Sequence, residues 1–114
     1  MSFPKRGEIW KVHFDPTVGG EIKKSRPAVV ISNDHNNRYA FTVTVLPITD
    51  KGQEVFPFEV FLPKTTEGLN KDSKIKCQQV RTVDKSRLAQ LLGHVDGQVL
   101  ALIERSIGLH LGFH

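Results

Sequence analysis

The sequence predicts a mainly β protein with α+β additions: a small, strongly bent β-barrel that ends in one helix. Period-two alternation of apolar residues recurs in about six short segments, and Gly, Pro and Asn residues separate them. Only the C-terminal segment has a helical period. At 114 residues the chain has the size of one domain with one modest core, so residues 1–114 are expected to form a single domain.

The first half of the chain contains three expected strands. Residues 8–14 alternate apolar and polar side chains, and residues 27–31 are apolar throughout, as in a central strand covered on both faces. The Asn- and Asp-rich residues 33–37 predict a turn. The next strand is expected over residues 42–46, with Pro47 as its end.

The second half continues this pattern. Residues 55–62 predict an edge or bulged strand because Pro57 cannot donate to a ladder. Residues 73–80 predict another strand, residues 81–88 a single helical turn, and residues 89–95 a last strand.

The last segment predicts the helix. Asp96 is the expected N-cap and Gly108 the expected C-terminal stop, and the apolar stripe between them consists of Val99, Leu100, Ile103 and Ile107. More apolar residues lie outside this stripe, namely Leu102, Leu109, Leu111 and Phe113. A barrel this small has difficulty covering them, so a homodimer is expected.

Composition narrows the function classes. The net charge of +4 and the pI near 9.4 are compatible with a polyanionic partner without requiring one. No apolar run is long enough for a transmembrane helix and no signal core is present, so the expectation is a cytoplasmic protein without a membrane partner. The five histidines are scattered, and no metal site or cofactor is expected. Cys77, the single cysteine, is expected to be buried and inert.

Residues 19–32 are the most informative stretch. A loop with two glycines, one acid and two lysines leads to Arg26 and Pro27 at the start of an apolar strand. Proline restricts the residue before it to extended backbone, so Arg26 is expected at a defined position where a planar fork of donors suits phosphate chemistry. From this segment alone, a solvated hairpin loop with a capping arginine explains the residues equally well.

An ordered set of short motifs spans nearly the whole chain. It consists of Arg6-Gly7-Glu8-Ile9-Trp10, Phe14-Asp15-Pro16, Gly20-Glu21, Arg26-Pro27-Ala28-Val29-Val30, Asn33-Asp34, Pro47-Ile48-Thr49, Pro57-Phe58-Glu59-Val60 and Gln79-Val80-Arg81. With these motifs the chain resembles the MazF/PemK family of toxin endoribonucleases from bacterial toxin–antitoxin pairs. The resemblance implies an SH3-like barrel with a C-terminal helix, the fold shared with CcdB-like toxins.

The resemblance also implies an activity and partners. The family forms homodimers that cut single-stranded RNA, including mRNA, at short sequences without a metal, and an antitoxin, expected here to be acidic, inhibits them. Matched residue by residue, the family's catalytic arginine, Ser/Thr and loop glutamate fall on Arg26, Thr49 and Glu21. The chain departs from the family at Ile22-Lys23-Lys24, where a glutamine and small residues are usual, and at Gln78, where an acid is frequent.

The chemistry of metal-free RNA cleavage supports these roles. The 2′-hydroxyl of the substrate is the nucleophile, so the protein mainly stabilises charge on a phosphorane-like transition state and leaves a 2′,3′-cyclic phosphate and a 5′-hydroxyl. Arg26 is an electrostatic clamp or a proton donor to the leaving 5′-oxygen rather than a base, because arginine stays protonated. Glu21 is a candidate base or a solvated loop acid, and Thr49 is a donor to phosphate or the start of a turn.

The expected RNA contacts are polar and basic residues around this loop and the 71–87 segment: Lys23, Lys24, Lys74, Lys76, Gln79 and Arg81. Each of them also fits a solvated surface. A competing hypothesis is a non-catalytic SH3-like binding module or a topoisomerase-directed toxin on the same fold. Digestion of single-stranded RNA in excess chelator separates the enzyme from this alternative.

Overall fold

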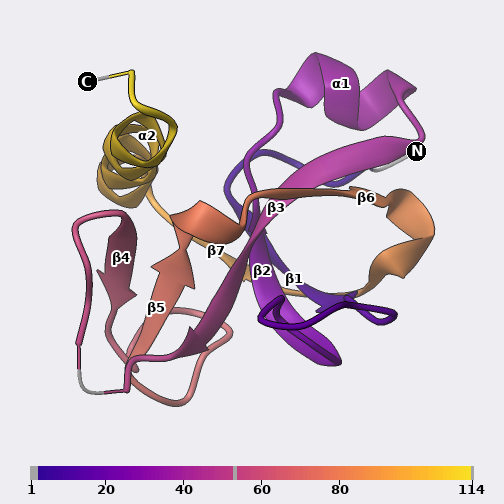
Figure 1. Ribbon diagram of the computed structural model, residues 1–114. Coiled ribbons are helices and arrows are strands. Elements are labelled where there is room, and N and C mark those ends of the chain that lie inside the picture. The colour runs from indigo at the N-terminus through magenta and orange to yellow at the C-terminus, as the bar shows by residue number, and fades with distance from the viewer. Residues whose placement is uncertain (1–2, 53, 114) are drawn as a thin grey trace.

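The computed structural model describes residues 3–52 and 54–113 (Figure 1). In this part of the chain a mainly β structure is followed by a C-terminal helix, which confirms the predicted fold class. The elements are β1 (Glu8–His13), β2 (Ser25–Val30), α1 (Asp34–Tyr39), β3 (Thr42–Asp50), β4 (Glu59–Leu62), β5 (Ser73–Lys76), the 3-10 turn η1 (Cys77–Gln79), β6 (Arg81–Asp84), the 3-10 turn η2 (Lys85–Arg87), β7 (Leu88–His94) and α2 (Gly97–Leu111).

The strands form one strongly curved antiparallel sheet in the order β4-β5-β3-β2-β1-β7, with β6 also paired to β3. The long strand β3 connects two parts of this sheet. Its first half pairs with β6 and its last residues pair with β5, while β2 pairs with its middle on the other side. The β6–η2–β7 segment curls around one side of the molecule, which gives the sheet its barrel-like shape (Figure 1).

The two faces of the sheet carry separate apolar clusters. The larger cluster includes Ile9, Leu46 and Ile48, and α2 covers it through Ile103 and its neighbours. The smaller cluster lies within the curled part of the sheet and consists of Val12, Phe14, Ala28, Val30, Val43, Val45 and Val83. Because side chains alternate along a strand, each central strand contributes to both clusters. The side chain of Arg26 falls on the face of the smaller cluster, two residues before Ala28.

The predicted central strand, the strand near the N-terminus and the last strand are confirmed as β2, β1 and β7. The 55–62 segment is shorter than predicted, because β4 begins only at Glu59, but it lies at the sheet edge as expected. The 73–80 segment leaves the strand after Lys76 and turns into η1. The predicted helical turn within 81–88 is η2, preceded by the short strand β6.

Two predictions for residues 33–47 are wrong. The predicted turn at 33–37 is the start of α1, where the Asn33 side chain caps the helix by accepting a hydrogen bond from the Asn36 N–H at 2.8 Å. Strand β3 runs through Pro47, which falls between the residues that pair with β6 and those that pair with β5. The missing proline N–H is tolerated at this position because neither of those two ladders includes it.

Helix α2 begins as predicted and ends later than predicted. Asp96 is the N-cap, and its side chain accepts a hydrogen bond from the Val99 N–H at 2.9 Å. The helix passes Gly108 and ends before Gly112, whose φ of 79° allows the left-handed cap that glycine tolerates. Neither α1 nor α2, the helices in the described part of the chain, is long and apolar enough to span a membrane.

Candidate functional site

Arg26 and Thr49 lie together at one end of the curved sheet. Ala28 on β2 pairs with Pro47 on β3, so the same antiparallel register extended by two residues places Arg26 across from Thr49. Both residues line one pocket of about 300 Å³. Two residues far apart in the chain are therefore brought to one site by strand pairing.

The Arg26 side chain is half-buried and unusual in its hydrogen bonding. Its Nε atom is buried and has no hydrogen-bond partner among the described residues. Buried polar groups in folded proteins are nearly always paired, because leaving one unpaired costs free energy. Because Arg26 lines the pocket, this donor is available to a group bound there.

The loop at residues 63–72 forms another wall of this pocket and is fixed on the sheet. Gly68 lines the pocket and has a φ of 88°. A Cβ at Gly68 would lie only 2.8 Å from the Leu92 carbonyl oxygen, so glycine lets the loop approach β7 closely. Leu69, the next residue, packs against the larger cluster.

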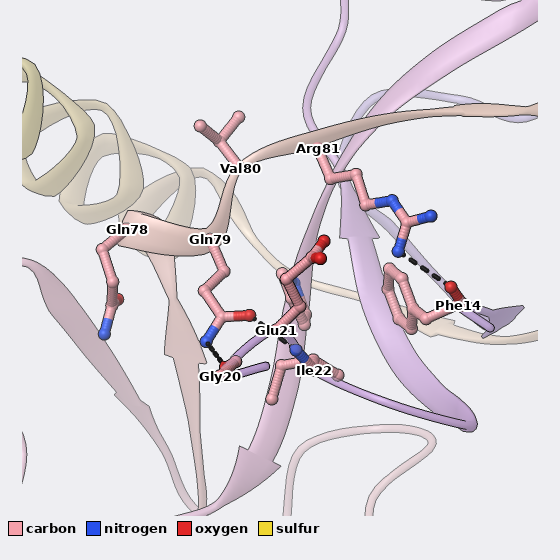
Figure 2. Close-up of a pocket in the computed structure, with 9 residues that line it drawn as sticks. Phe14, Gly20, Glu21, Ile22, Gln78, Gln79, Val80 and Arg81 are labelled. Carbon is pink, nitrogen blue, oxygen red and sulfur yellow. Dashed lines mark hydrogen bonds between the residues drawn. The ribbon is translucent and has the colours of Figure 1, made fainter. Parts of the chain in front are cut away.

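A second pocket of about 370 Å³ lies next to the first along β3, because Pro47 lines the one and Ile48 and Thr49 line the other. Figure 2 shows the second pocket with Glu21 from the loop after β1, and with Gln79 and Arg81 from the η1 and β6 segments. The Glu21 carboxylate accepts a hydrogen bond from the Val18 N–H at 2.8 Å. The structure therefore places Glu21 in its own turn and not in the pocket that Arg26 lines.

The loop at residues 14–24 is attached to the body at several points. Its base is closed by a hydrogen bond from the Phe14 N–H to the Lys24 carbonyl at 2.8 Å. Ile22 packs against the smaller apolar cluster, so this apolar departure from the family pattern covers the end of the barrel. Lys23 and Lys24 are exposed on the same loop.

Two arginines, one on β6 and one in η2, hold the start of this loop by hydrogen bonds. The Arg81 guanidinium donates to the Phe14 carbonyl at 2.9 Å and lies 5.6 Å from the centre of the Phe14 ring. Arg87 donates to the carbonyls of His13 and Asp15 at 3.0 and 2.6 Å. Part of the donor capacity of Arg81 is therefore used inside the protein.

Lys74 and Gln78 belong to a buried polar network around Glu59. The Lys74 Nζ lies 3.0 Å from Glu59 Oε1 and Gln78 Nε2 donates to Glu59 Oε2 at 2.8 Å. Burial alone would raise the pKa of Glu59, but the hydrogen bonds from Gln78, the Phe56 N–H and Lys74, with the charge of Lys74, lower it. This network explains why the chain has Gln78 where an acid is frequent in the family. An ionised acid at position 78 would face the Glu59 carboxylate and repel it, whereas the glutamine amide donates a hydrogen bond to it.

Lys76 is half-buried on β5, and within the described ranges its side chain makes no hydrogen bond or ion pair.

Cys77 is buried, as expected. Burial, followed by the nearby charge of Glu59, raises the pKa of its thiol to about 12, which disfavours the reactive thiolate. Across residues 3–52 and 54–113, no cluster of three or more His, Cys, Asp or Glu side chains is suited to a metal.

Sequence reasoning missed two features of this region. The first is the Glu59–Lys74 pair, although opposite charges on neighbouring strands of a hairpin are a readable signal. The second is the 63–72 loop as a wall of the Arg26 pocket. No local motif marks this loop, because its place depends on the contact of Gly68 with β7.

The fold and the site define a small β-barrel protein with a free arginine donor and a threonine in one pocket, beside a basic loop. Residues 5–111 match the family described as PemK-like, MazF-like toxins of type II toxin–antitoxin systems. The chain belongs to this family, which confirms the resemblance seen in the sequence.

Similar proteins cover nearly the whole chain. The endoribonuclease MazF9 of Mycobacterium tuberculosis is 41% identical over 112 residues, which span 94% of this chain and 95% of the relative. A crystal structure of MazF from Deinococcus radiodurans has a TM-score of 0.85 and 29% identity, covering 98% of this chain and 99% of its own. A MazE–MazF structure from Deinococcus radiodurans has a TM-score of 0.77 and 26% identity, covering 98% of each chain.

Proposed function

We propose that this chain is the toxin of a type II toxin–antitoxin system and that it cleaves single-stranded RNA, including messenger RNA, as a metal-independent, sequence-selective endoribonuclease. Residues 1–114 act as one toxin domain, and the substrate places the activity in the cytoplasm. The observation that carries the proposal is the pocket shared by Arg26 and Thr49, in which the buried Arg26 Nε has no protein partner among the described residues. The family and its named endoribonuclease relatives support it.

The reaction proceeds by attack of the RNA 2′-oxygen on the adjacent phosphorus. The new O2′–P bond forms while the P–O5′ bond breaks, giving a 2′,3′-cyclic phosphate and a 5′-hydroxyl end. Arg26 donates hydrogen bonds to the non-bridging oxygens, where negative charge increases in the transition state. Thr49 donates a further hydrogen bond to the same phosphate, since it lies across from Arg26 and lines the same pocket.

We assign the removal of the 2′-hydroxyl proton to Glu21. Its Oε1 is held by the Val18 N–H, and its side chain lines the pocket adjacent to that of Arg26. An RNA strand that spans the two adjacent pockets passes this carboxylate. Glu21 takes the proton from O2′, a water molecule protonates the leaving O5′, and the proton on Glu21 then returns to solvent, so the cleavage step needs no reactant other than water.

The RNA strand follows the polar surface that joins the two pockets. Lys23, Lys24 and Lys76 are available for phosphate contacts, and Arg81 contributes the donors that Phe14 does not use. Lys74 does not contact the RNA phosphates directly, because its charge is paired with Glu59 and its side chain is only 13% exposed. Single-stranded RNA is bound through such phosphate contacts together with base stacking and edge recognition.

Two protein partners follow from the family assignment. The exposed apolar residues of α2 and the C-terminal segment, Leu102, Leu109, Leu111 and Phe113, provide a surface for a homodimer. A MazE–MazF structure is among those that the fold resembles. An acidic antitoxin segment that is disordered when free would bind the same basic surface as RNA by presenting carboxylates in place of phosphates.

The test is digestion of a long single-stranded RNA by the purified chain in excess chelator. Discrete fragments with 2′,3′-cyclic phosphate and 5′-hydroxyl ends are expected. A matched oligonucleotide with deoxyribose at the cleavage position should remain intact, because it lacks the nucleophile. Intact RNA in the first reaction would favour the non-catalytic binding module, and efficient cleavage of the deoxy substrate would show that water is the nucleophile.

A further inference from the structure

We infer that Gln79 is a positioning residue that holds the 14–24 loop in one arrangement, rather than a residue whose amide reads the RNA. The inference rests on the proposed function, because it assigns the loop's acid and lysines to the same reaction. It departs from the sequence expectation, which placed Gln79 among the RNA contacts. Its basis is the set of hydrogen bonds that Gln79 makes.

Both ends of the Gln79 amide face the loop (Figure 2). Its Oε1 accepts a hydrogen bond from the Ile22 N–H at 2.8 Å, and its Nε2 lies 3.4 Å from the Gly20 carbonyl oxygen as a weaker donor. Gln79 is 57 residues away from Ile22 in the chain, so these bonds connect the loop to a separate part of the fold. These two bonds fix the orientation of the amide toward the loop backbone.

Gln79 adds hydrogen bonds to the middle of the loop, which is otherwise attached there through the packing of Ile22. Within it, Val18 and Glu21 bond only to each other, through the Glu21 N–H to the Val18 carbonyl and the Val18 N–H to the Glu21 carboxylate. In the described residues, the Gln79 side chain is the one group outside the loop that hydrogen-bonds to residues 16–23. The sequence there includes Gly19 and Gly20, whose backbone entropy opposes an ordered loop.

Gln79 is itself held firmly. It ends the 3-10 turn η1, whose first residue, Cys77, is completely buried in the larger cluster. The next residue, Gln78, donates to the buried Glu59 at 2.8 Å. Helix α2 packs against the same turn. The side chain of Gln79 therefore extends from a rigid part of the protein, as a residue that positions a loop requires.

The consequence is that Gln79 controls where Glu21, Lys23 and Lys24 lie relative to Arg26. An ordered loop has already lost its conformational entropy before RNA binds, which raises the apparent affinity. Loss of the anchor should therefore raise KM for RNA. It should also let the loop open more often, although the rest of the fold is unchanged.

The experiment measures loop opening and RNA cleavage separately. Trypsin cuts after exposed lysines, so cleavage after Lys23 and Lys24, followed by mass spectrometry, reports the loop without RNA; the Arg26-Pro27 bond resists trypsin. The variants are Gln79→Leu and Gln79→Ala, which lose the amide, and Gln79→Glu, which keeps an acceptor for the Ile22 N–H. Gln90→Leu, on the exposed surface of β7, is the matched control.

We expect Gln79→Leu and Gln79→Ala to be cut at the loop about 10-fold faster at unchanged melting temperature, with kcat/KM for RNA reduced about 10-fold, mainly through KM. Gln79→Glu should stay within about 3-fold of wild type in the trypsin assay, and Gln90→Leu should match wild type in both assays. A loss of RNA cleavage with an unchanged trypsin rate would show direct RNA contact and overturn the inference. Faster trypsin cleavage with unchanged RNA kinetics would overturn it too, whereas a wild-type chain that leaves RNA intact would refute the proposed function instead.

Discussion

Replacing Arg26 with methionine should raise the stability of the protein while it removes the activity. The Arg26 Nε is buried without a partner among the described residues, and an unpaired buried donor costs about 1–3 kcal/mol. Methionine keeps an unbranched stem of similar length and has no donor or charge to bury. We therefore expect Arg26→Met to gain about 1 kcal/mol in the free energy of unfolding, which raises Tm by roughly 4 °C for a domain of this size.

The same substitution should lower RNA cleavage by about 100-fold or more, since losing one preorganised donor to a transition-state oxyanion typically costs that much. Thermal unfolding gives the stability, and single-turnover cleavage of a defined oligonucleotide gives the rate of the chemical step. Arg26→Lys is the matched control, because it keeps the charge but loses the planar fork of donors. If Arg26→Met is less stable than wild type and still cleaves within about 10-fold of its rate, Arg26 has a structural role and the mechanism is wrong.

Four further predictions concern the site and the partner surface. Thr49→Val should reduce the cleavage rate about 10-fold while Thr49→Ser stays near wild type, because the hydroxyl is one neutral donor; equal rates for both variants would remove Thr49 from the mechanism. Glu21→Gln retains an acceptor for the Val18 N–H but cannot take a proton, so it should reduce kcat about 100-fold; a kcat within about 3-fold of wild type would identify another base. Glu59→Gln should cost about 3 kcal/mol of stability at pH 7 by breaking a buried ion pair. Because the folded-state pKa of Glu59 is lowered, this stabilisation is present above the unfolded pKa near 4.5 and disappears as the pH falls through the folded-state pKa. The unfolding free energies of the two proteins, measured by urea titration from pH 7 to pH 3, should therefore converge, and a constant difference would contradict the ion-pair explanation. Leu102→Glu should shift light-scattering mass toward the 12.8 kDa monomer if the apolar α2 surface forms the homodimer, and an unchanged dimer would place the interface elsewhere.

The sequence was sufficient for the elements whose signal is local and repeated. Alternation identified β1, a continuous apolar run identified β2, and the four-residue apolar spacing with Asp96 as N-cap identified α2. It failed where one short feature had two explanations. Asn33 caps a helix of only six residues, which is too short for a helical period to be visible. Gly108 resembled a helix stop because sequence alone does not show that Gly112 adopts the left-handed backbone.

The candidate site was predictable through its motifs rather than through its geometry. Arg26 and Thr49 were selected from the sequence, and strand register explains how they meet. The sequence did not indicate that Lys74 is paired with Glu59 or that Gln79 bonds to the loop. Those roles depend on contacts between neighbouring strands and between residues 57 positions apart in the chain. The sequence shows which residues are basic or polar, but it does not show which of them are in contact.

The internal use of Lys74 and Arg87 has a consequence for how steeply RNA binding depends on salt. Each phosphate that a protein cation neutralises releases condensed counterions, and log K falls by about 0.7 per contact for each tenfold rise in salt on single strands. With Lys74 paired and Arg87 holding two backbone carbonyls, the cations best placed for direct phosphate contact are Lys23, Lys24, Arg26, Lys76 and Arg81, which keeps its charge while it donates to the Phe14 carbonyl. Five contacts per protomer correspond to a slope of about −3.5, which is shallower than the count of lysines and arginines suggests. A shallow slope would leave room for salt-independent contacts such as base stacking and recognition of base edges, which are the contacts that can distinguish one cleavage sequence from another.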